Sequence, residues 1–144
     1  MYVELHAASA FSFLDGASLP EALVERAAAF GYPALALLDR DGVYGAPRFH
    51  LAAQRAGLKA IIGAELTLAV GARRSALGAR VSKAPDLDTA ERRTPSNERR
   101  LFTLPVLIQS REGYKNLCRL VTEMKLRAPK GEGVLAIDEL DGRV

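Results

Sequence analysis

One short run constrains the fold of this chain more than any other feature: residues 34–38 are apolar throughout, with no polar alternation. A strand that is buried on both faces has this pattern, which is typical of a parallel sheet covered by helices. Asp39 and Arg40 follow the run directly. Because the carboxyl ends of parallel strands carry the sites of α/β folds, the run predicts an α/β protein with site residues at that edge of its sheet.

Strands and helices alternate along the rest of the sequence. Apolar spacing and turn residues predict four strands, at residues 2–6, 34–38, 59–70 and 101–108, the third of them interrupted at Gly63. Three helices are predicted at residues 18–30, 46–56 and 111–127. This alternation indicates right-handed crossovers and a parallel sheet, either doubly wound or barrel-like. Four strands are too few to close an eight-stranded barrel.

The first helix has sequence signals at both ends. Ser18 is the predicted N-cap, Pro20 lies in the first turn, Glu21 completes a capping box and Gly31 suits a left-handed C-cap. The 3.6-residue spacing predicts a buried face made of Leu19, Leu23, Val24, Ala27 and Phe30.

The third helix carries a comparable stripe, which is predicted to consist of Tyr114, Leu117, Cys118, Val121 and Met124. Cys118 is the single cysteine of the chain, so it cannot form an internal disulfide. Its place in the stripe predicts a thiol in the core.

Composition indicates one globular domain. The 144 residues are 49% hydrophobic and 26% charged, and no apolar run approaches the length that spans a membrane. Met1 leads straight into the first predicted strand, without a basic and apolar leader. We therefore expect a cytoplasmic protein with no membrane partner.

The net charge of +3 is unevenly distributed. Residues 71–100 hold eight Lys and Arg against four Asp and Glu, which leaves twelve against thirteen in the rest of the chain. This segment lacks apolar periodicity and is rich in Arg, Ser, Ala and Pro, so it is predicted to be a flexible insertion. A solvated loop is the favoured interpretation, and contact with nucleic-acid phosphates is the alternative.

Four segments together carry a resemblance. Residues 5–16 read LHAASAFSFLDG, residues 34–45 read ALALLDRDGVYG, residues 60–66 read AIIGAEL, and LPVLI at 104–108 leads into REGYKNL at 111–117. In this order they resemble the polymerase-and-histidinol-phosphatase (PHP) domain at the N-terminus of bacterial C-family DNA polymerases. This is the family of the polymerase III alpha subunit, and the resemblance is greatest to its error-prone branch.

The resemblance implies a fold and a parent protein. The fold is a PHP-type distorted (β/α)7 barrel, of which residues 1–144 hold the N-terminal part, so the chain is expected to be a fragment with an open sheet edge and poor solubility. The parent is expected to synthesise DNA on a template, in replication or damage-tolerant repair, with Mg²⁺ held by a palm domain outside these residues. The expected partners are the remaining polymerase domains of the same chain and, through the parent, DNA.

Side chains at the predicted strand ends suggest a metal site. His6, Asp39 and Glu65 end three strands, and Asp15 lies on the loop after the first. One imidazole and three carboxylates suit manganese, zinc or iron. The resemblance matches His6, Asp15 and Glu65 to metal ligands of the family. Asp39 by itself is predicted to be a strand-end turn or capping residue.

Several family histidines are missing. By the resemblance, Ala8 replaces the second histidine, Arg40 replaces one that often follows the strand-end aspartate, and none lies near Thr103. The only other histidine, His50, matches no ligand position.

The Arg40 guanidinium would compete with a metal for the carboxylates of Asp15 and Glu65. We therefore predict a vestigial metal site at His6, Asp15 and Glu65, in a chain that is catalytically silent by itself and acts as a scaffold. No cofactor is expected for it beyond weak residual Mn²⁺ or Zn²⁺.

Two other classes of function stay open. One is a free-standing PHP metal-dependent phosphoesterase, which the missing histidines and the REGYKNL helix start disfavour. The other is a basic nucleic-acid-binding domain that uses residues 71–100 and would lose affinity steeply with salt. Residues 42–45 open the second helix, and there a turn is favoured over a phosphate-binding loop.

Overall fold

A computed structural model describes residues 2–70 and 100–142 of the chain. The basic insertion predicted at residues 71–100 lies outside the described residues, except for Arg100. The elements are, in chain order, β1 (Glu4–Ala7), α1 (Pro20–Ala29), β2 (Ala34–Arg40), α2 (Ala46–Arg55), β3 (Lys59–Val70), β4 (Arg100–Leu107), α3 (Arg111–Leu126), β5 (Leu135–Ala136) and the 3₁₀ helix η2 (Ile137–Leu140). Each predicted strand and helix is present, whereas β5 and η2 were not predicted.

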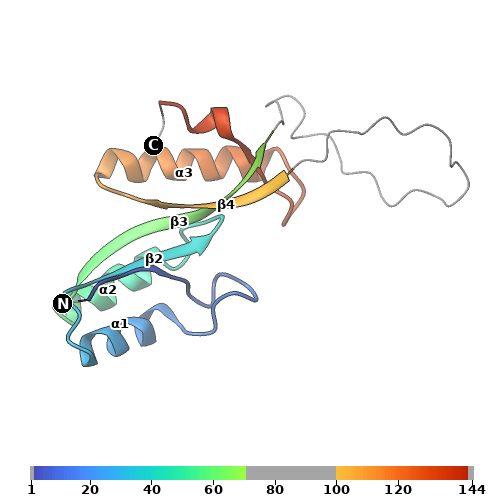
Figure 1. The fold of residues 1–144 in the computed structure, drawn as a ribbon. Coiled ribbons are helices and arrows are strands. Elements are labelled where there is room, and N and C mark those ends of the chain that lie inside the picture. Colours follow the sequence, from blue (N-terminus) through green and yellow to red (C-terminus); the bar gives the residue numbers. More distant parts are fainter. Residues whose placement is uncertain (1, 71–99, 143–144) are drawn as a thin grey trace, which may run out of the picture.

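The strands form one curled sheet. Its order is β1-β2-β3-β4, and β5 also pairs with β3. The pairs β1/β2, β2/β3 and β3/β5 are parallel. The long strand β3 bends along its length, with α1 and α2 beside β2 and with α3 near β4 (Figure 1). This arrangement confirms the predicted α/β class and partial barrel.

The prediction of an all-parallel sheet is wrong for β4. This strand runs antiparallel to β3, with Gly63 opposite Leu107 and Thr67 opposite Thr103. An apolar run marks a strand, but the strand's direction depends on the connection that precedes it. Here that connection is the basic segment, whose sequence gives no sign of a crossover helix.

Gly63 lies inside a continuous strand, and the predicted interruption there is wrong. A Cβ atom at this position would lie 2.2 Å from the carbonyl oxygen of Val106 on β4. Only glycine therefore allows the two strands to approach this closely.

Two apolar clusters fix the helices on the sheet. The first joins α1 and α2 to β2 and consists of Val24, Ala27, Leu35, Leu37, Phe49, Ala53 and Leu58. The second joins α3 to β3 and consists of Ala64, Leu66, Leu68, Leu117, Leu120, Val121, Met124, Leu135 and Leu140. No helix within residues 2–70 and 100–142 is long and apolar enough to cross a bilayer.

The start of α1 differs from the prediction. Leu19 occupies the N-cap position without a side-chain cap, while the carbonyl of Ser18 accepts a hydrogen bond from the Ala10 amide at 2.8 Å. Leu19 and Phe30 are 49% and 58% exposed, so the buried face is narrower than predicted. The predicted left-handed C-cap is confirmed, because Gly31 has a φ of 69°.

The buried stripe of α3 is shifted by part of a turn. Cys118 and Tyr114 are only half-buried, and Leu120, which was not predicted, is fully buried. The prediction that Cys118 is a core thiol is therefore wrong. Burial of the phenol, with the Cys118 thiol beside it, raises the pKa of Tyr114.

An ion pair at low exposure attaches η2 to the end of α3. The Arg127 guanidinium donates to the carboxylate of Glu139, and its Nη2 also donates to the Val134 carbonyl at 3.1 Å. Glu139 in turn accepts from the Ala136 amide at 2.8 Å. These bonds fix the turn that brings β5 onto β3.

Candidate functional site

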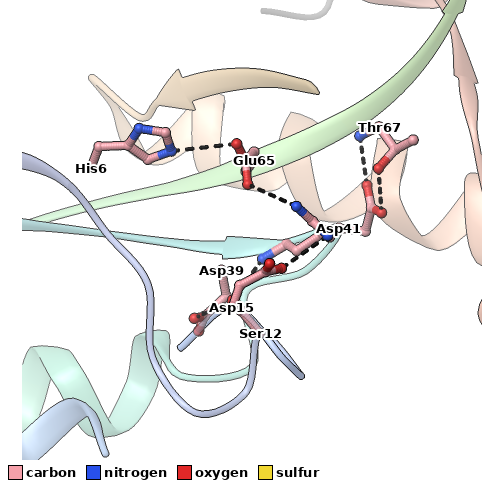
Figure 2. A network of polar contacts seen from close by, with 8 residues as sticks. His6, Ser12, Asp15, Asp39, Asp41, Glu65 and Thr67 are labelled. Atoms are coloured by element: carbon pink, nitrogen blue, oxygen red, sulfur yellow. Dashed lines mark hydrogen bonds and ion pairs between the residues drawn. The ribbon is translucent and has the colours of Figure 1, made fainter. Parts of the chain in front are cut away.

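The carboxyl ends of β1 and β2 and the middle of β3 bring three of the side chains considered above to one place. Glu65 has five further strand residues after it in β3, so the prediction that it ends a strand is wrong. Arg40 and Glu65 are register partners on adjacent parallel strands, so their side chains lie on the same face of the sheet. His6 reaches them from β1 and Asp15 from the loop that follows it (Figure 2). We call His6, Asp15, Arg40 and Glu65 the Arg40 cluster.

The guanidinium is the centre of this cluster. Arg40 Nη1 lies 2.9 Å from Asp15 Oδ2, and Nη2 lies 3.8 Å from Glu65 Oε2. The other Glu65 oxygen, Oε1, is 3.5 Å from His6 Nε2. The side chains are between 19% and 52% exposed, so water reaches all of them.

Glu4 holds the backbone of β1 next to His6. Its Oε1 accepts from the His6 amide at 2.8 Å, and its Oε2 accepts from the Tyr2 hydroxyl at 2.6 Å. These two hydrogen bonds lower the pKa of Glu4, the Tyr2 hydroxyl having the larger effect. The Glu4 carboxylate in turn raises the pKa of Tyr2.

The side chains present do not fit a hydrolytic metal centre. Within residues 2–70 and 100–142, no three His, Cys, Asp or Glu side chains are grouped as metal ligands. The Arg40 cation binds the two carboxylates that would hold an ion, and Ala8 contributes no donor. Thr103, near which a family histidine was expected, lies on β4 opposite Thr67, two positions beyond Glu65 on β3, and contributes no imidazole. The vestigial site at His6, Asp15 and Glu65 stays a prediction.

Asp39 belongs to a different, buried network. As the residue before Arg40 on a strand, it projects to the opposite face of the sheet, where it is 1% exposed. Its Oδ1 accepts from the Ser9 amide and hydroxyl, both at 2.8 Å, and from the Ser12 hydroxyl at 2.9 Å. Its Oδ2 accepts from the Gly45 amide at 3.3 Å. We call Asp39, Ser9, Ser12 and Gly45 the Asp39 brace.

The brace ties the β1–α1 loop to the end of β2 and the start of α2. The Ser12 hydroxyl also accepts from the Arg40 amide at 2.9 Å, which fixes the loop beside the Arg40 cluster. Two glycines make this packing possible, because a Cβ at Gly16 would lie 2.1 Å from the Ser9 carbonyl oxygen and one at Gly45 2.6 Å from Asp39 Oδ2. The interpretation of residues 42–45 as a turn therefore agrees with the structure, in which their last amide bonds Asp39.

Sequence reasoning named Asp39 as a turn or capping residue but missed its partners. Ser9 and Ser12 are 0% and 2% exposed. Their three-residue spacing in a loop is the only signal that pointed to them, and serines are common in loops for many reasons.

Asp41 makes a third contact at this edge. It has a left-handed φ of 48°, its amide donates to the Glu65 carbonyl at 2.8 Å, and its carboxylate accepts from the Thr67 amide and hydroxyl at 2.7 and 2.8 Å (Figure 2). The backbone that carries Arg40 and Glu65 is thus fixed on both sides. His50 is exposed on α2 and belongs to neither network.

Comparison with known proteins places these features in context. Residues 4–140 match the PHP domain family. An error-prone DNA polymerase of Ralstonia nicotianae is 42% identical over 139 residues, covering 96% of this chain and 11% of its own length. That of Anaeromyxobacter sp. is 46% identical over 132 residues, covering 92% and 9%. The chain therefore spans about a tenth of the length of these relatives.

Two solved structures share the fold. An amidohydrolase from Chromobacterium violaceum, with bound sulfate and no metal, has a TM-score of 0.54 at 24% identity, covering 85% of this chain and 32% of its own. A provisionally assigned metal-dependent phosphoesterase from Bifidobacterium adolescentis has a TM-score of 0.52 at 20% identity, with coverages of 86% and 33%. At these identities the likeness concerns the fold alone.

Proposed function

Because the chain belongs to the PHP domain family, we propose that it is the PHP region of an error-prone DNA polymerase of the C family. The observation that carries this proposal is the pair of relatives with that name, which are 42% and 46% identical across 96% and 92% of the chain. The parent would add nucleotides to a DNA primer on a template, in replication or damage-tolerant repair in the cytoplasm. Its Mg²⁺ ions and its polymerase domains would lie outside these residues.

Within that parent, this region acts as a structural scaffold rather than as a phosphoesterase. The Arg40 cluster supports this role, because a permanent guanidinium cation neutralises Asp15 and Glu65 where a hydrolytic site needs a divalent ion and a metal-bound water. The role of His6, Asp15 and Glu65 as a vestigial site, with at most weak Mn²⁺ or Zn²⁺, is part of the proposal.

The exposed surface of β4 supports packing against further parts of the parent. This strand ends the path of sheet pairing among the described residues, and Leu101 and Leu107 on it are 59% and 46% exposed. Exposed apolar side chains on a strand that has one unpaired edge favour association with another chain segment.

The test is made on the full-length protein that contains this chain. We expect the full-length protein to extend a primer on a DNA template with Mg²⁺. Arg40→Ala should leave the extension rate unchanged, while deletion of residues 1–144 should remove folded, active enzyme. Failure of the full-length protein to extend primers would overturn the polymerase proposal.

A second assay separates the scaffold from the phosphoesterase. The 144-residue chain is incubated with Mn²⁺ and a chromogenic phosphate monoester, next to a His6→Ala variant. We expect no turnover by either protein. Turnover by the unaltered chain that is lost in the His6→Ala variant would replace the scaffold role by phosphoesterase activity.

A further inference from the structure

A hollow in the surface lies away from the Arg40 cluster. It is a cavity of about 880 Å³, lined by residues from α2, from the start of β3 and from the junction of β4 with α3. Its volume lies within the range of roughly 300–1,000 Å³ that is typical of small-molecule sites. None of the four residues of the Arg40 cluster lines it.

The floor of the cavity is apolar and held in place. Ala60, Ile62 and Ile108 form this apolar part of the lining, which Ile61 also joins. Ala60 and Ile62 also pack on the first core cluster and Ile108 on the second, so both cores fix the floor. The Ile108 amide donates to the Ile62 carbonyl at 2.8 Å, which joins the two strands beneath the cavity. A preformed apolar floor of this kind suits the flat body of a ligand.

The rim is basic. Lys59, Arg111 and His50 line the cavity, and no Asp or Glu does. Lys59 and Arg111 form no ion pair or side-chain hydrogen bond with the residues that the structure describes, whereas Glu112, the neighbour of Arg111, pairs with Lys115 at 3.0 Å. The Ser110 hydroxyl is engaged as the cap of α3, accepting from the Gly113 amide at 3.1 Å. Two cations at the mouth are thus left for an anionic ligand.

An aromatic ring completes the lining. Tyr114 is half-buried on the first turns of α3 and lines the cavity with a neutral phenol ring. Flat nucleobases stack on neutral aromatic rings and on aliphatic side chains, and phosphates pair with Lys and Arg. The apolar lining, the Tyr114 ring and the two cations together therefore match a ligand with a planar body and an attached phosphate.

We propose that this cavity binds a nucleoside phosphate, with the base against Tyr114 and the isoleucine floor and the phosphate held by Lys59 and Arg111. The ligand is either a free nucleotide or one nucleotide of a single DNA strand, since both present the same chemistry. Only the choice of nucleotides over other planar phosphates rests on the proposed function.

The first experiment measures binding to the 144-residue chain. Fluorescence anisotropy of a labelled hexathymidylate is followed at fixed salt, with thymidine monophosphate, thymidine and inorganic phosphate as competitors. We expect thymidine monophosphate to compete at least about tenfold better than either thymidine or phosphate alone, because both halves of the site contribute. Calorimetry of thymidine monophosphate alone distinguishes a free nucleotide from a strand. An affinity equal to that of the hexathymidylate indicates that the ligand is a free nucleotide, and a weaker one indicates a nucleotide within a strand.

Matched variants locate the site. The double variant Lys59→Ala/Arg111→Ala should weaken binding by at least about tenfold, because each of the two substitutions removes a charged contact with the phosphate. Arg119→Ala with Lys130→Ala removes the same charge outside the cavity and should change affinity less than about twofold. Tyr114→Leu puts an aliphatic side chain in place of the ring on α3. Because the stacking surface for the base is lost, binding should weaken about fivefold or more.

The proposal would be overturned by absence of binding, by equal losses in the two charge-matched double variants, or by an acidic peptide that binds this cavity while thymidine monophosphate does not. Loss of binding when residues 71–99 are deleted, with no effect of the cavity variants, would assign the affinity to the basic segment and overturn it as well. None of these outcomes affects primer extension by the full-length protein, so the polymerase proposal fails or stands on its own test.

Discussion

Asp39 and Arg40 are neighbours on β2, yet they belong to two polar networks of different character. The Asp39 brace has serine and aspartate side chains that are at most 2% exposed, and the carboxylate accepts four hydrogen bonds. The Arg40 cluster has side chains that are 19% to 52% exposed and are joined by ion pairs of 2.9 to 3.8 Å. The alternation of a strand alone separates the two environments.

This difference in burial indicates which network contributes more to the free energy of unfolding. A buried acceptor or donor that loses its partner costs about 1–3 kcal/mol, whereas an exposed ion pair contributes about 0–1 kcal/mol. The brace is therefore expected to be intolerant of change. The side chains of the Arg40 cluster are expected to be replaceable at little cost to stability.

The largest effect is expected for Asp39→Ala. The change leaves the hydroxyls of Ser9 and Ser12 and two backbone amides without their acceptor, so the free energy of unfolding should fall by about 3 kcal/mol. Urea denaturation followed by circular dichroism measures it. Asp138→Ala removes an equal charge from an exposed position and serves as the control. Similar losses in the two variants would contradict the difference between the networks.

A smaller loss is expected for Ser12→Ala. The hydroxyl bridges Asp39 and the Arg40 amide, so its removal should cost about 1–2 kcal/mol of unfolding free energy in the same assay. Ser18→Ala is the matched control, because Ser18 is exposed and makes no side-chain cap. If Ser18→Ala proved as costly as Ser12→Ala, the capping box predicted from sequence would be correct after all.

The fold could largely be predicted from sequence because its signals are local. The continuous apolar run at 34–38 became a strand buried on both faces, and Gly31 and Gly57 have the left-handed φ values that suit the ends of helices. The direction of β4 could not be predicted, since it depends on the path of the chain before it. β5 has only two residues, too few for a periodic pattern.

The site divides in the same way. The meeting of His6 and Arg40 followed from strand ends, because parallel strands align their carboxyl ends at one edge. Glu65 lies in the middle of the longer strand β3 and meets them because it is the register partner of Arg40. The contacts of Ser9 and Ser12 depend on how a twelve-residue loop folds back over β2, which no spacing in the sequence encodes. Tertiary hydrogen bonds between side chains far apart in sequence, such as those over 30 and 27 residues in the brace, are visible only in the structure.

Arg40→Ala tests the Arg40 cluster, as Asp39→Ala tests the Asp39 brace. Among the residues that the structure describes, the side chain makes ion pairs that water reaches, so the free energy of unfolding should change by less than about 1 kcal/mol. Without the guanidinium, the carboxylates of Asp15 and Glu65 lose the cation that both of them contact. We therefore expect Mn²⁺ or Zn²⁺ to raise the melting temperature of this variant more than that of the unaltered chain.

The control for this prediction is Arg48→Ala, which removes a cation from another exposed ion pair, the one with Glu21. It should gain no metal response. A loss of several kcal/mol in Arg40→Ala would mean that the exposed cluster, and not only the brace, holds the fold. Equal metal responses in the two variants would mean that Arg40 does not occupy the place of an ion.

The smallest effect concerns the pair Glu21–Arg48, which joins α1 to α2 outside both networks and calibrates what an exposed ion pair does here. Arg48 Nε donates to Glu21 at 2.6 Å, and this hydrogen bond lowers the pKa of Glu21 below its ordinary 4.5. The stabilisation is complete above the unfolded-state pKa and is lost as the pH falls through the lowered folded-state value. Proton titration by NMR should find the Glu21 pKa below 4.5 in the unaltered chain and higher in Arg48→Ala, while Lys130→Ala leaves it unchanged. A Glu21 pKa that does not respond to Arg48→Ala would show that even this short contact does not persist in water. The ion pairs of the Arg40 cluster, at 2.9 and 3.8 Å, would then owe their geometry to the backbone hydrogen bonds of the brace alone.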